Sequence, residues 1–304
     1  MNDRVTLVEM GPRDGLQNEP HLLPLPLRVE LVERLWHSGL TRIEVAAFVS
    51  AKRVPQMADS AALLAALPRH AGLRLGALVP NEQGLKAALA AGVQEIGLFT
   101  ACSEGFTRAN IGVGVEESLA RFAPLASEAR RHGIRVRGYL STVIACPYDG
   151  ITRPKRVAQL AARLLDLGCN EISLGDTIGV GTPGSVAPML DAVLGEVPAG
   201  QVAVHFHDTY GQALANLLPA LERGIRLIDS SVAGLGGCPY APGASGNLAS
   251  EEVVYLLQGL GLDCGVSLPS LAATGEWVSR ALGRPNGSRT GRALCAKVRQ
   301  EVLS

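Results

Sequence analysis

A short run of β-branched and other apolar residues, followed by a helical pattern, recurs along this chain about every 30 residues, the length of a βα unit. Apolar residues at helical spacing, such as Leu160, Leu164 and Leu167, mark the helical segments, and Gly168 ends that one. We expect eight strands, at Val5–Met10, Arg42–Ala47, Leu73–Val79, Glu95–Phe99, Ile134–Leu140, Glu171–Leu174, Val202–Phe206 and Leu227–Val232. The alternation of strand and helix favours a parallel sheet, because parallel strands need crossover connections.

A parallel sheet has two unpaired edges unless it closes, and eight strands with intervening helices match the number in a closed barrel. The sequence therefore predicts an α/β fold, a (β/α)8 TIM barrel with additional C-terminal helices. An open, doubly wound sheet is the alternative. We see no linker that would separate two domains, so we expect a single domain over residues 1–304.

The expected domain has three parts along the chain. These are a barrel core at residues 1–235, a glycine-rich active-site loop at 236–247 and C-terminal helices at 248–304. Helical patterns follow the last strand at about Leu248–Leu260 and Ser267–Leu282. The segment Gly283–Arg292 is rich in Gly, Arg and Ser, so we expect a solvated loop there, before a last short helix.

Composition and charge exclude several classes of protein. The 28 basic residues balance the 28 acidic ones, which argues against a nucleic-acid partner, and the apolar share of 47% argues against disorder. Residues 230–250 carry no charge, but five glycines and two prolines indicate a loop there instead of a membrane span. The six cysteines lack paired spacing and the start of the chain has no signal-peptide core, so we expect a cytoplasmic protein with no membrane partner.

Polar residues gather where the predicted strands end, which is where TIM barrels place their sites. His205 and His207 are two residues apart on one strand, so both side chains point to the same face. With Asp14 after strand one and Asn247 after strand eight, they form a mixed nitrogen and oxygen set. Such a set suits Mn²⁺, Mg²⁺, Co²⁺ or Zn²⁺, so the sequence predicts a divalent metal site without choosing the metal.

Three other residues have both a structural and a functional interpretation. Arg13 either forms an ion pair at the barrel rim or stabilises an oxyanion, and Glu44 is expected to orient it. Cys238 is either a small buried side chain or a proton donor or acceptor on the glycine-rich loop.

Taken together, the motifs are more specific than any one of them. They are residues 11–19 (GPRDGLQNE), 171–184 (EISLGDTIGVGTPG), 205–213 (HFHDTYGQA) and 232–241 (VAGLGGCPYA). They closely resemble the hydroxymethylglutaryl-CoA lyase family, and the resemblance extends from about Val5 to about Gly283. That family is similar to isopropylmalate and homocitrate synthases, within the aldolase-type barrels.

The resemblance implies an enzyme that uses a divalent cation, Mg²⁺ or Mn²⁺, to cleave 3-hydroxy-3-methylglutaryl-CoA into acetyl-CoA and acetoacetate, as in leucine catabolism and ketone body formation. It also implies an acyl-CoA substrate and a small homo-oligomer, a dimer or a tetramer. The residues that match the family's metal ligands are Asp14, His205, His207 and Asn247. Those that match its catalytic and substrate-binding groups are Arg13, Gln17, Glu44, Asp176 and Cys238.

This likeness suggests a mechanism for breaking the bond between C2 and C3 of a tertiary alcohol. The cation lowers the pKa of the C3 hydroxyl, and His205, or Asp14 acting through a water, takes its proton. Arg13 then stabilises the thioester enolate that leaves, and Cys238 protonates its carbon.

Departures from the family's pattern keep other functions open. Ala51 and Arg53 replace the family's Pro and Trp, and Thr142 and Ala145 also differ, in segments that open toward the pocket. One alternative is therefore the same cleavage of a longer 3-hydroxy-3-alkylglutaryl-CoA. The others are a Claisen-type synthase that joins acetyl-CoA to a 2-oxo acid, and a non-catalytic barrel that binds acyl-CoA.

Overall fold

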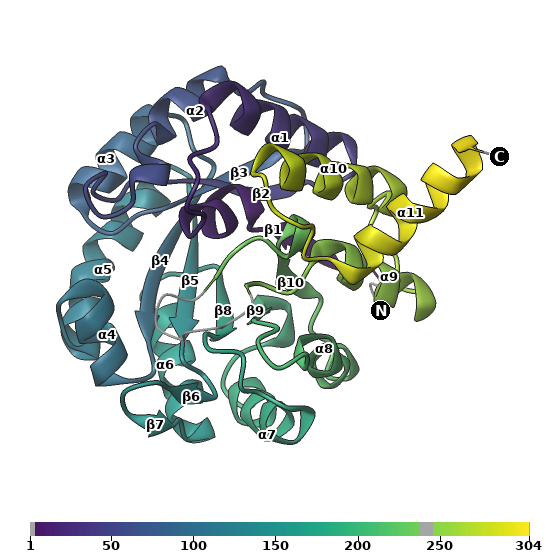
Figure 1. Cartoon of the computed structure of the whole chain (residues 1–304). Helices are drawn as coiled ribbons and strands as arrows, with labels where there is room; N and C mark the ends of the chain where they lie inside the picture. Colours follow the sequence, from purple (N-terminus) through teal and green to yellow (C-terminus); the bar gives the residue numbers. More distant parts are fainter. Residues whose placement is uncertain (1–3, 238–245, 304) are drawn as a thin grey trace.

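The computed structural model describes residues 4–237 and 246–303, and it confirms the predicted parallel barrel (Figure 1). The strands close in the order β1-β10-β9-β8-β5-β4-β3-β2. They are β1 (Thr6–Glu9), β2 (Arg42–Ala47), β3 (Arg74–Leu78), β4 (Glu95–Ala101), β5 (Arg135–Ser141), β8 (Glu171–Asp176), β9 (Val202–Phe206) and β10 (Leu227–Ser230). Each matches a predicted strand, with its ends moved by at most two residues.

Helices surround the strands on the outside of the barrel (Figure 1). They are α1 (Leu25–His37), α2 (Ser60–Ala66), α3 (Glu82–Ala90), α4 (Glu104–Ile111), α5 (Val115–Arg131), α6 (Pro154–Asp166), α7 (Pro183–Leu194) and α8 (Ala213–Glu222). Short elements lie between them: η1 (Gly11–Gly15), η2 (Pro55–Met57), η3 (Ala199–Gln201), η4 (Val232–Gly234), and the hairpin of β6 (Ala145–Cys146) and β7 (Gly150–Ile151). In the part of the chain that the structure describes, no helix is both long and apolar enough to cross a membrane.

Three further helices follow the barrel: α9 (Ser250–Gly259), α10 (Leu268–Ala281) and α11 (Arg289–Leu303). The prediction of a solvated loop at Gly283–Arg292 is wrong in part, because Asn286 and Ser288 are buried. The backbone N–H of Gly287 donates to the Ala233 carbonyl at 3.0 Å, which ties this segment to η4. Ser288 accepts from Gly291 N at 2.9 Å, as a cap at the start of α11. The side chains of Asn286 and Ser288 thus accept hydrogen bonds from the backbone of this segment.

The interior of the barrel contains a ladder of ion pairs as well as apolar side chains. Arg42 pairs with Glu95 and Glu171, at 2.7 and 2.8 Å. Arg137 pairs with Glu171 at 2.8 Å and with Asp229 at 2.6 Å. All five side chains are buried. We call these five residues the interior charge ladder. Removing these five charges from water costs much free energy, so each charge is stable in the interior only while its oppositely charged partners are present.

We therefore predict that Arg137→Met destabilises the protein by about 3–5 kcal/mol, because it leaves Glu171 and Asp229 buried beside an apolar side chain. Urea unfolding followed by circular dichroism measures the change. Arg163→Met is the matched control, since Arg163 pairs with Glu116 in solvent on the outer face of α6. An Arg137→Met variant that unfolds at the same urea concentration as this control would contradict the prediction.

Candidate active site

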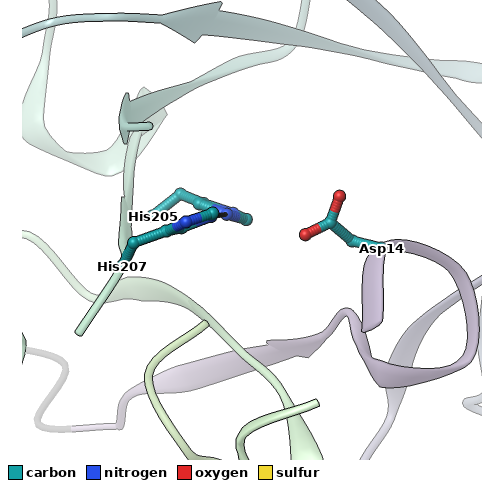
Figure 2. Close-up of side chains that lie close together, drawn as sticks. All are labelled: Asp14, His205 and His207. Atoms are coloured by element: carbon teal, nitrogen blue, oxygen red, sulfur yellow. Dashed lines mark hydrogen bonds between the residues drawn. The ribbon is translucent and has the colours of Figure 1, made fainter. Parts of the chain in front are cut away.

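Asp14, His205 and His207 meet at the carboxyl end of the barrel strands. Figure 2 shows both imidazole rings directed toward the Asp14 carboxylate. One ligand atom from each residue lies within 4.8 Å of the others, and the two Nε2 atoms of the histidines are 3.3 Å apart. Within the described residues, this is the group of His, Cys, Asp and Glu side chains that is arranged to hold a metal ion.

The local backbone explains how Asp14 reaches the histidines. It lies in η1, a single π-turn in which the N–H of Gly15 donates to the Met10 carbonyl at 3.0 Å. A Cβ atom on Gly15 would lie 2.8 Å from the Cβ of Leu235, so only glycine permits this close approach. The turn therefore depends on a contact with the segment that follows η4.

Asn247 joins the group from the far side of the glycine-rich loop. Its amide nitrogen donates to Asp14 Oδ2 at 2.8 Å and to the Leu235 carbonyl at 3.2 Å. Among the described residues, its buried Oδ1 atom has no hydrogen-bond partner, and neither does Nδ1 of His207. Buried polar atoms are rarely left unpaired, and Oδ1 of Asn247, beside the Asp14 carboxylate, is therefore an acceptor that a ligand would complete.

The two histidines differ in their electrostatics. The Asp229 carboxylate accepts from Nδ1 of His205 at 3.2 Å, so in the neutral ring the lone pair is on Nε2, the atom that lies 3.3 Å from Nε2 of His207. Burial lowers the pKa of His205, but Asp229 more than offsets this and the pKa is raised. Burial and the neighbouring His205 lower the pKa of His207 to about 4, so His207 is neutral at pH 7. Neutral imidazole is the form that binds metals.

Arg13 lies beside this group as a fixed cation. It is buried, and it bonds to Glu44 through Nε and to Asp14 Oδ1 at 2.7 Å through a terminal nitrogen. Burial alone would lower the pKa of Arg13, but the two carboxylates raise it above its ordinary value. Tyr139 donates to the other oxygen of Glu44, so that carboxylate is held from two sides. The Arg13 side chain therefore has a single, well-defined orientation.

The remaining predicted residues are Gln17, Asp176 and Cys238. The amide nitrogen of Gln17 donates to Asp14 Oδ1 at 3.3 Å, and Gln17 lines the cavity at the site. Asp176 is fully buried and accepts from the backbone N–H groups of Val180 and Gly181, at 3.3 and 2.7 Å. Its carboxylate thus holds the loop after β8, and a direct part in catalysis stays a prediction. Cys238 lies outside the described residues.

A cavity of about 1130 Å³ opens in front of these groups. This exceeds the roughly 300–1,000 Å³ that is usual for small-ligand pockets. Its polar side is formed by Arg13, Asp14, Gln17, His205 and His207. Its apolar side is formed by the ends of β3 and β4 with α4 and α5, through Leu78, Phe99, Phe106, Ile111, Phe122 and Leu125. The cavity thus offers both ionic and apolar contacts to one ligand.

Sequence reasoning missed Tyr139 and Asp229, the residues that orient Glu44 and His205. Each lies inside a strand, whereas we considered the polar residues at the ends of the strands. Their signal was the spacing of polar residues at alternate strand positions, as in Arg137 and Tyr139. Such residues point to one face, and in a barrel that face is the interior.

Comparison with known proteins adds independent information. The family model described as HMGL-like matches residues 4–278. A Pseudomonas aeruginosa protein named 3-hydroxy-3-isohexenylglutaryl-CoA/hydroxy-methylglutaryl-CoA lyase is 52% identical, over 97% of this chain and 98% of its own length. The mitochondrial hydroxymethylglutaryl-CoA lyase of Bos taurus is 52% identical, over 96% of this chain and 90% of its own. The corresponding Arabidopsis thaliana protein is 53% identical, and the matched region spans 63% of its length.

Solved structures agree with these relatives. The crystal structure of hydroxymethylglutaryl-CoA lyase from Pseudomonas aeruginosa has a TM-score of 0.95 at 52% identity, covering 98% of this chain and 100% of that one. An HMG-CoA lyase from Acinetobacter baumannii, solved with coenzyme A and 3-methylmalate, has a TM-score of 0.92 at 32% identity and covers 96% of both chains. The chain belongs to the HMGL-like family, the family of hydroxymethylglutaryl-CoA lyases that its motifs resemble.

Proposed function

We propose that this protein is a lyase that uses a divalent cation to cleave 3-hydroxy-3-methylglutaryl-CoA into acetyl-CoA and acetoacetate. The observation that carries the proposal is the convergence of Asp14, His205 and His207 beside a fixed arginine, Arg13, in one cavity. The names of the relatives support the substrate. These relatives are named as lyases, which favours a lyase over the two alternatives, a Claisen-type synthase and a non-catalytic barrel.

The chemistry divides into a proton removal, a bond cleavage and a proton return. Loss of the C3 hydroxyl proton lets C3 become a ketone, and the electron pair of the C2–C3 bond moves to C2. The acetyl thioester then leaves as an enolate, which takes one proton at C2 to become acetyl-CoA. No oxidant or reductant is needed.

The residues that would hold the cation are Asp14, His205, His207 and Asn247. The neutral imidazole of His207, the Asp14 carboxylate and the unpaired Oδ1 atom of Asn247 fit such an ion. Mg²⁺ and Mn²⁺ are the proposed metals. A cation bound there supplies a Lewis acid, which lowers the pKa of an alcohol.

The chain's own groups perform the rest. Arg13, held by Glu44 and Asp14, offers its guanidinium to the enolate oxygen and stabilises the negative charge that develops there. Asp14 acting through a water takes the hydroxyl proton, or His205 takes it at Nε2 when that atom does not ligate the cation, because Nδ1 of His205 is bonded to Asp229. Cys238 returns a proton to C2, and Gln17 binds the substrate. A catalytic part for Asp176 is proposed from the motif alone.

The cellular setting is also a proposal. Among the described residues, Cys102, Cys146, Cys169 and Cys264 are buried thiols outside any disulfide, which supports a reducing compartment such as the cytoplasm. The relatives carry both mitochondrial and cytoplasmic names. The expected dimer or tetramer stays a prediction.

Removal of divalent metal is expected to abolish the release of acetoacetate from 3-hydroxy-3-methylglutaryl-CoA. The protein is treated with EDTA and desalted, and Mg²⁺ or Mn²⁺ is then added back, which restores turnover. Metal at 100 times its Kd also stabilises the fold by about 2.7 kcal/mol, which thermal unfolding detects without substrate. Full turnover by the metal-free protein would disprove the metal dependence.

Arg13→Lys is expected to lower kcat by about 10²–10³-fold, because a single ammonium cannot bond to Glu44 and Asp14 and still face an oxyanion. Initial rates at saturating substrate measure the loss. Arg163→Lys, on the outer face of α6, serves as the control and keeps the wild-type kcat. If both variants kept the wild-type kcat, Arg13 would have no catalytic role.

A second candidate, a substrate with a longer 3-alkyl chain, is favoured by the apolar side of the cavity. The methyl group of 3-hydroxy-3-methylglutaryl-CoA is small beside a wall of six large apolar side chains. Burial of additional methylene groups there contributes about 0.8 kcal/mol each. A longer chain would thus gain affinity without change at the reacting atoms.

We predict that the protein also cleaves 3-hydroxy-3-isohexenylglutaryl-CoA, with acetyl-CoA formation as the readout. Leu78→Phe fills part of the apolar side and is expected to reduce kcat/KM for this substrate more than for the methyl one. Leu78→Met, which conserves volume, is the control. Turnover of the methyl substrate alone would rule out the second candidate and leave the first intact.

A further inference from the structure

Glu9, at the end of β1, is a buried carboxylate that binds three separate segments at once. Its Oε1 atom accepts from the backbone N–H of Gly11 and of Val232, each at 2.8 Å. The hydroxyl of Ser250 donates to Oε2 at 2.6 Å. The side chain is fully buried, and a Cβ atom on Gly11 would lie 2.6 Å from Oε1. The carboxylate therefore fills its space closely.

Each of these segments leads to a part of the candidate site. Gly11 begins η1, the turn that carries Asp14. Val232 begins η4, which runs into the glycine-rich loop. Ser250 begins α9, three residues after Asn247. A second contact joins two of these segments, because the Asn247 amide donates to Asp14 at 2.8 Å.

The three donors that surround Glu9 are all neutral groups, two backbone N–H groups and one hydroxyl. Burial raises the pKa of Glu9 to about 7, although Ser250, Val232 and Gly11 all donate to it. The described ion pairs include none to Glu9. The neighbouring buried carboxylate, Glu251, accepts from the backbone at η4, through Ala233 N at 3.0 and 3.1 Å, and from its own backbone N–H. Glu9 is thus the carboxylate that joins η4 to the Asp14 turn.

We propose that Glu9 is a positioning residue of the lyase: its three hydrogen bonds set the relative positions of Asp14, Asn247 and the start of the glycine-rich loop. The inference rests on the proposed function for its catalytic consequence. Its effect on metal binding depends on the geometry alone. If the turn and the Asn247 segment move apart, the two oxygen ligands no longer face the histidines.

Three substitutions distinguish the effect of side-chain length at position 9 from the effect of its charge. Glu9→Gln keeps an acceptor for Gly11 and Val232 and can donate to the Ser250 hydroxyl, whereas Glu9→Asp is one methylene too short and Glu9→Ala has no acceptor. We expect Glu9→Asp and Glu9→Ala to weaken Mn²⁺ binding about 10–100-fold, the usual effect of losing a supporting contact, and to lower kcat more than they raise KM. Glu9→Gln is expected to stay within about threefold of wild type in both measurements.

Mn²⁺ titration followed by electron paramagnetic resonance measures binding without substrate, and acetyl-CoA release gives kcat and KM. Leu164→Ala, a buried change in α6 remote from the site, controls for lost stability, since it lowers the unfolding temperature and leaves the Mn²⁺ Kd unchanged. Wild-type Mn²⁺ affinity in folded Glu9→Ala, or an equal loss in Glu9→Gln and Glu9→Ala, would overturn the proposal. Inactive wild-type protein whose Mn²⁺ binding still depends on Glu9 would contradict only the proposed function.

Discussion

The contact between Asp229 and His205 is the interaction on which the site depends. Asp229 is buried in the barrel, where it pairs with Arg137 and accepts from Ser173 and His205. Burial raises the pKa of its carboxyl group, but Arg137 and His205 lower it well below the ordinary value. The carboxylate therefore stays ionised, and it holds the imidazole in one tautomer and one orientation.

The interior charge ladder extends this effect down the barrel. Asp229 is held by Arg137, Arg137 by Glu171 and Glu171 by Arg42, on strands that are far apart in the sequence. A buried charge is costly unless its partners are well placed, so the ladder requires an accurate barrel. A barrel that forms these pairs also places His205 correctly. Stability and metal-ligand geometry thus depend on the same side chains.

Much of this arrangement could be predicted. The strands were predicted correctly, because β-branched runs between helical patterns are a local signal. The shared face of His205 and His207 was also predicted, because side chains alternate along a strand. The burial of Ser288 was not predicted. A Gly/Ser/Arg-rich segment has the same sequence pattern whether its polar atoms bind water or backbone groups. The loop-holding contacts of Asp176 were hidden for a similar reason: a motif shows a carboxylate but not the donors that surround it.

By itself, the sequence determined the barrel, the strand ends at which chemistry occurs and the residue types of the site, because these follow from periodicity and local motifs. Only the tertiary structure decided which side chains meet: that Asp14 faces the histidines, that Tyr139 and Asp229 orient their partners, and that Glu9 joins three segments. Hydrogen bonds and ion pairs form over a few ångströms in space. Residues hundreds of positions apart, such as Glu9 and Ser250, come within that range only when the barrel closes.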